Sequence, residues 1–135
     1  MNLVERLVQA DVDKAYELKR DVYKSKRLQE LLGTEEPVEV VVKELPQRTI
    51  KAHMAMQYSS SGKHQMDRIF DTELMNLVEG VVEPSLKDKD LRDHYRVQTP
   101  KELAEVLFGR EVSSISDKIM ELSGYADDIE EDVKN

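Results

Sequence analysis

Three histidines are the first side chains to consider for chemistry, because imidazole binds metals and exchanges protons near neutral pH. They stand at His53, His64 and His94. Their spacing does not match a zinc site, and no carboxylate motif accompanies any of them. A structural role for each histidine is therefore the favoured interpretation.

The segment Ser61-Gly62-Lys63-His64 superficially resembles a phosphate-binding loop. It lacks the first glycine of such a loop, the hydroxyl residue after the lysine and a preceding strand. A plain surface loop is the favoured interpretation here as well.

Asp88, Asp90 and Asp93 have the alternating look of a calcium-binding loop. Such a loop, counted from Asp88, needs glycine at its sixth position and glutamate at its twelfth. The chain has Asp93 and Thr99 there. The pattern therefore indicates a solvated turn.

Asp67 and Asp71 lie one helical turn apart and are the remaining candidates for a carboxylate site. No second pair of carboxylates matches them, so a polar helix face is favoured, and an enzyme acting through them is a remote alternative. The sequence thus predicts no catalytic residue, no cofactor-binding residue, no metal ligand and no bound cofactor. It predicts a binding protein and not an enzyme.

Methionine can fill irregular gaps in a core and can also form adaptable binding surfaces. Core filling is the favoured role for five of the methionines, with a binding surface as the alternative: Met54, Met56, Met66, Met75 and Met120.

Charge is unevenly placed along the 135 residues. The net charge is −8, and residues 1–60 carry ten residues of each sign, whereas residues 61–135 carry 10 basic and 18 acidic ones. This excess argues against nucleic-acid and anionic-membrane partners. The chain contains no cysteine and no apolar run long enough for a signal peptide or membrane helix, so a cytoplasmic location is expected.

Helical spacing of apolar residues predicts a short amphipathic helix over residues 3–8. Residues 14–32 fit either a continuous helix or a strand followed by a short helix, with Gly33 as the stop. Residues 38–45 alternate as a strand between two prolines, and a strand needs a partner for its backbone groups. Residues 19–25 are the nearest candidate partner.

Further helices are expected over residues 48–58 and 66–82, the second with a wide apolar face typical of a central core helix. A single helical turn is expected around Asp90–His94. Between Thr99 and Gly124 two short helices fold back on each other, with Thr99 as N-cap and Gly109 as a stop. The expected fold is mainly helical α+β with a small two-stranded element near the N-terminal third. One domain over residues 1–124 is expected to precede an acidic tail, residues 125–135.

The order of segments resembles that of the XkdN-like phage tail assembly chaperones of PBSX-type phages and prophages. The resemblance covers almost the whole length and is strongest from residue 74 onward. The segments that carry it are Ser25–Leu28, Leu31–Gly33, Val78–Lys87, Asp90–Leu91, Thr99–Leu103, Leu107–Phe108, Glu111–Ile119, Glu121–Tyr125 and Val133–Asn135.

This resemblance implies a non-catalytic role in building a long phage tail. Such chaperones hold the tape-measure protein while tail-tube subunits assemble around it, and they are absent from the finished tail. The implied partners are the tape-measure protein and the tail tube protein, with self-association into a homo-oligomer also allowed. An acidic regulator or inhibitor of a basic partner is the alternative that the charge leaves open.

Overall fold

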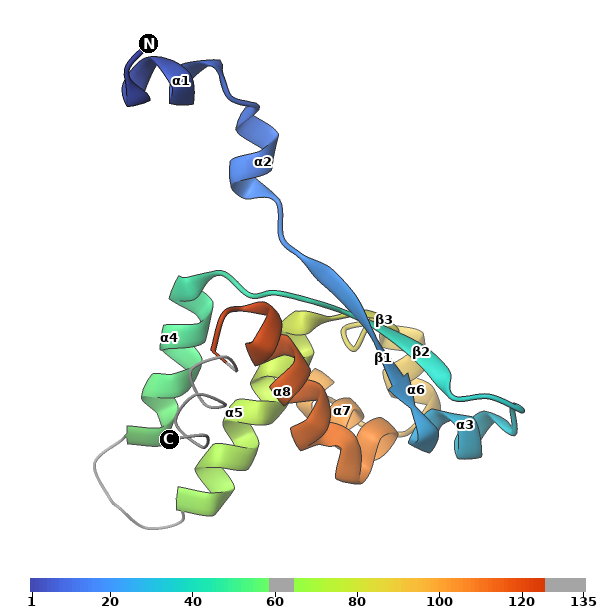
Figure 1. Ribbon diagram of the computed structural model, residues 1–135. Coiled ribbons are helices and arrows are strands. Elements are labelled where there is room, and N and C mark those ends of the chain that lie inside the picture. The colour runs from blue at the N-terminus through green and yellow to red at the C-terminus, as the bar shows by residue number, and fades with distance from the viewer. Residues whose placement is uncertain (59–64, 126–135) are drawn as a thin grey trace, which may run out of the picture.

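The structure is a computed structural model that describes residues 1–58 and 65–125, with a mainly helical α+β fold (Figure 1). The expected loop at 59–63 and most of the acidic tail lie outside these residues. Along the chain the elements are α1 (Leu3–Gln9), α2 (Val12–Tyr16), β1 (Arg20–Ser25), α3 (Lys26–Leu32), β2 (Val38–Lys43), α4 (Gln47–Ala55), the 3-10 turn η1 (Met56–Tyr58), α5 (Gln65–Gly80), β3 (Val81–Glu83), α6 (Lys89–His94), α7 (Pro100–Phe108), the 3-10 turn η2 (Gly109–Glu111) and α8 (Val112–Leu122).

The strand at β2 forms because its valines alternate, and Val40 and Val42 are fully buried. All six residues of β1 pair with β2 in antiparallel register. The strand-then-helix alternative is therefore confirmed over residues 20–32, whereas residues 14–16 belong to α2, a helix that neither alternative included. Ser25 caps α3, and Gly33 ends it in the left-handed conformation.

A third strand, β3, makes the sheet larger than the two strands expected, in the order β1-β2-β3. The prediction of a helix to residue 82 was wrong at its end, because α5 stops at Gly80. Val81 is β-branched, buried and paired with Val42, and Pro84 follows three residues after it. Sheet pairing and burial override the helical periodicity here.

The two C-terminal helices have the predicted bounds, and both pack chiefly on α5. Thr99 caps α7 by accepting a hydrogen bond from the Glu102 backbone N–H at 3.1 Å. The face that α7 buries consists of Leu103, Ala104, Leu107 and Phe108. Ala104 and Phe108 are fully buried, while Val106 is 40% exposed.

Close packing of α5 on α8 depends on Gly80. A Cβ at this position would lie 2.6 Å from Ile119 Cδ1. The glycine, costly inside a helix, therefore permits the approach of the two helices that form much of the core.

Candidate interaction surfaces

The two histidines within the described residues have structural contacts. His53 is buried, with Nδ1 2.7 Å from Asn76 Oδ1, and Asn76 Nδ2 donates to Ser116 Oγ at 3.0 Å. This chain of side chains joins α4, α5 and α8. His94 contacts the Tyr95 ring edge-on, with centroids 5.0 Å apart.

The segment from Ser61 to His64 lies outside the described residues, so its predicted loop stays a prediction. Asp67 and Asp71 lie on α5, and Asp71 pairs with Lys101 of α7 at 3.5 Å. In the portion of the chain that the structure describes, no group of three or more histidine or carboxylate side chains could hold a metal ion.

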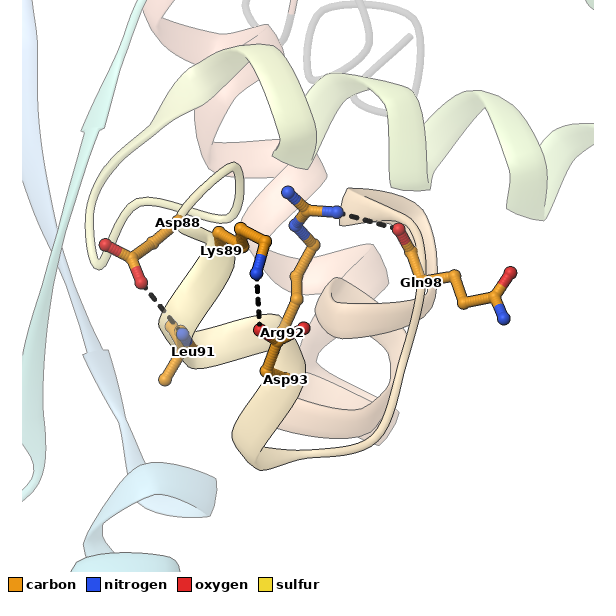
Figure 2. Close-up of polar contacts among 6 residues, drawn as sticks. All are labelled: Asp88, Lys89, Leu91, Arg92, Asp93 and Gln98. Atoms are coloured by element: carbon orange, nitrogen blue, oxygen red, sulfur yellow. Dashed lines mark hydrogen bonds and ion pairs between the residues drawn. The ribbon is translucent and has the colours of Figure 1, made fainter.

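The aspartates around α6 act as a helix cap and a helix ion pair (Figure 2). Asp88 Oδ1 accepts a hydrogen bond from the Leu91 backbone N–H at 2.8 Å, and Asp93 Oδ2 accepts one from Lys89 Nζ at 3.0 Å. Asp90 lies in the first turn, where a negative charge is favourable. The three carboxylates thus form a capped turn.

The methionines divide between core and surface. Met54 and Met120 pack against the buried core, as core filling predicts. Met75 is half-buried, whereas Met56 and Met66 are exposed.

A carboxylate that the sequence did not single out, Glu111, joins the last third of the chain to the start of α3. It accepts hydrogen bonds from Ser25 Oγ at 2.5 Å and from the backbone N–H groups of Lys26 and Arg27 at 3.1 and 3.3 Å. It also accepts one from the Tyr23 hydroxyl at 3.3 Å, and burial, followed by this negative charge, raises the pKa of Tyr23. No local pattern indicates such contacts, because the partners lie more than 80 residues away.

The first apolar surface belongs to the N-terminal arm, residues 1–17, which contains α1 and α2. The arm extends away from the remaining elements, and neither helix has a buried residue (Figure 1). The helix expected at 3–8 is confirmed, but its apolar face is not covered. The exposed apolar side chains of the arm include Leu3, Val4, Leu7, Val8, Val12 and Tyr16.

The second apolar surface is the α3 groove, a hollow of about 250 Å³ at the end of the sheet where β1 leads into α3. Leu31 and Leu32 at its mouth are 46% and 62% exposed. Two carboxylates, Glu39 and Glu83, also line it. Its apolar lining includes Leu28, Leu31, Leu32, Pro84, Leu91 and Tyr95.

Both of these surfaces are apolar and open to a partner. Among the helices described, none has the length and apolar character required to cross a membrane. The arrangement is therefore suited to contacts with apolar faces of other proteins.

The chain matches the family model for the phage XkdN-like tail assembly chaperone protein over residues 4–135. Among solved structures, the crystal structure of the protein YqbN is similar, with a TM-score of 0.55 and 20% sequence identity. The match covers 80% of this chain and 88% of that one. At this identity the likeness shows the fold alone. A comparison with curated protein sequences found no match.

Proposed function

Because the chain belongs to the phage XkdN-like tail assembly chaperone family, whose members are not enzymes, we propose that it binds the tape-measure protein during tail assembly. The observation that carries this proposal is the family match across residues 4–135. The proposed place of action is the host cytoplasm, before the tail is finished, and the protein would be absent from the mature virion.

The physical task of such a chaperone is to cover apolar surface until assembly buries it. A tape-measure protein is a very long helical chain whose apolar seams would otherwise promote aggregation. Amphipathic helices bind in apolar grooves through residues spaced by three and four positions. The arm and the α3 groove supply surfaces of both kinds, which supports the proposal.

The direct test is co-expression with the tape-measure protein encoded by the same phage or prophage. We expect the tape-measure protein to stay soluble and to co-purify with this chain, and an unrelated acidic protein of similar size to have neither effect. Failure of the two proteins to associate, both with and without the tail tube protein, would contradict the proposal.

Salt separates this function from that of an acidic regulator. Apolar contacts persist at moderate salt, whereas attraction between an acidic surface and a basic partner is screened beyond about 8–10 Å at 0.1–0.15 M ionic strength. Capture of the tape-measure protein should therefore survive a wash at moderate salt. We assign the binding to a domain over residues 1–124, so removal of residues 126–135 from the acidic tail should leave capture intact.

A further inference from the structure

The arm and the α3 groove complement each other, and we propose that the arm of one copy occupies the α3 groove of a second copy. This contact goes beyond tape-measure binding and does not depend on it. It would give the chain a self-association surface in addition to any surface used for a tail protein.

The apolar match is the first argument. Leu3 and Leu7 are each 65% exposed and lie on one face of α1 with Val4 and Val8. A seven-residue helix is too short to persist in water without packing on something. The groove offers an apolar hollow bordered by two exposed leucines, which are themselves costly to leave in water.

Charge complementarity is the second argument. Arg6 and Glu5 border opposite edges of the apolar face of α1, by their helical positions, and Glu39 and Glu83 line the groove. The charges therefore favour the orientation with the Arg6 edge toward the two groove carboxylates and the Glu5 edge away from them. An arm seated in the groove would place this guanidinium near two carboxylates. Such a pair adds little affinity at a surface, but it fixes the orientation of the docked helix.

The position of the arm indicates that the groove is filled by the arm of a second copy and not by the arm of the same copy. The arm leaves the body at the start of β1, whereas the groove lies beyond the other end of that strand, and the arm points away from it (Figure 1). Residues 10–19 span at most about 24 Å when α2 stays helical, and β1 alone spans about 20 Å. Docking of α1 into the groove of its own copy would stretch residues 10–19 almost to their full length. Docking into the groove of a second copy does not require this segment to stretch or to fold back.

The test uses the absence of cysteine from the whole sequence. Two single-cysteine variants, Leu7→Cys and a tagged Leu32→Cys, are mixed under mild oxidation, and mass spectrometry measures the mixed disulfide dimer. The matched control pairs Leu7→Cys with tagged Met66→Cys, whose position on α5 is also exposed. We expect the first pair to cross-link at least about tenfold faster, and excess unmodified protein to slow it by competition.

Equal rates for the two pairs would overturn the proposal. So would rapid formation of an intrachain disulfide in the Leu7→Cys, Leu32→Cys double variant at dilutions where the mixed pair does not react. That second result would place the arm in its own groove.

Association of the unlabelled protein gives a second measurement, by sedimentation equilibrium over a range of concentrations. Replacing Leu3 and Leu7 by serine should weaken self-association at least about tenfold, because apolar burial supplies the contact. Replacing Glu5 and Gln9 by serine on the same helix is the control and should leave it within about threefold. No difference between these variants, or a protein monomeric throughout, would also overturn the proposal. All of these measurements use the purified chain alone, so their failure is distinguishable from failure to bind the tape-measure protein.

Discussion

The N-terminal arm and the α7–α8 pair have similar sequence patterns, but the apolar residues of the arm are exposed and those of the pair are mostly buried. Each contains short helices with apolar residues at spacings of three and four, and each begins with a side-chain cap. In α8, Val112, Ile115 and Ile119 are fully buried, whereas α1 and α2 bury nothing. Periodicity therefore shows that a face needs covering, but it does not show which molecule covers it. The following predictions test how far the two regions differ.

Phe108 provides the largest expected effect, because it is the largest fully buried side chain among the residues that the structure describes. Phe108→Ala should lower the free energy of unfolding by about 3–5 kcal/mol, through lost burial and the cavity left behind. Val106→Ala, on the same helix but 40% exposed, is the matched control and should cost less than about 1 kcal/mol. Urea denaturation followed by circular dichroism measures both. Similar losses for the two variants would contradict the assigned face of α7.

Glu111 should give the next largest effect. Glu111→Ala removes the shared acceptor of Ser25, Lys26 and Arg27, so the first backbone N–H groups of α3 lose their partner. We expect a loss of about 2 kcal/mol, typical of unpaired polar groups in a partly buried site. Glu105→Ala, exposed on α7, is the control and should change stability by less than about 0.5 kcal/mol. If Glu111→Ala and Glu105→Ala lower the free energy of unfolding equally in urea denaturation, the contacts of Glu111 with the start of α3 add no stability.

Gly80→Ala tests the close approach of α5 and α8. Overpacking against Ile119 should cost about 1–3 kcal/mol, offset by about 1 kcal/mol of helix propensity. The net loss should therefore be about 1 kcal/mol. Ile119→Val removes the nearest methyl group, so a double-mutant cycle should show that the two changes together cost less than their sum. Strict additivity would contradict the predicted steric conflict.

The pair formed by Asp21 of β1 and Lys118 of α8 should make a smaller contribution to stability, which is lost at acid pH. Lys118 donates to Asp21 Oδ2 at 2.9 Å, and this hydrogen bond is the main cause that lowers the pKa of Asp21. A lowered pKa in the folded state adds stability above the unfolded value of about 3.9. That contribution disappears as the pH falls through the folded pKa. Asp21→Asn should therefore flatten the fall in thermal midpoint between about pH 5 and pH 2, and Lys118→Met should do the same. A curve that either variant leaves unchanged would contradict the coupling.

Most of the fold could be predicted from local patterns, and the failures have a common cause. Caps and stops at Thr99, Gly33 and Gly109 set helix bounds within the chain itself, so those elements matched. β3 was missed because its pairing with β2 involves residues about 40 positions away. Glu111 was missed for the same reason. The turn expected around Asp88, Asp90 and Asp93 is present, because its cap and ion pair are local. The arm's isolation from the body, in contrast, leaves no mark on the periodicity of its apolar residues.

Deletion of residues 1–17 should change the free energy of unfolding of the remaining chain least of all. It is also the most direct test of the difference between the exposed arm and the buried α7–α8 pair. The deletion keeps Lys19, whose backbone N–H donates to Glu44 at 2.7 Å, and removes no buried side chain. At low protein concentration the free energy of unfolding should stay within about 0.5 kcal/mol of that of the full chain. At high concentration the full chain should gain stability by mass action as its arm docks in a second copy, and the deletion variant should not. Thermal midpoints measured over a hundredfold range of concentration would separate these cases. A loss of stability in the dilute deletion variant would mean that the arm packs on its own body, so the contrast between the two regions would fail.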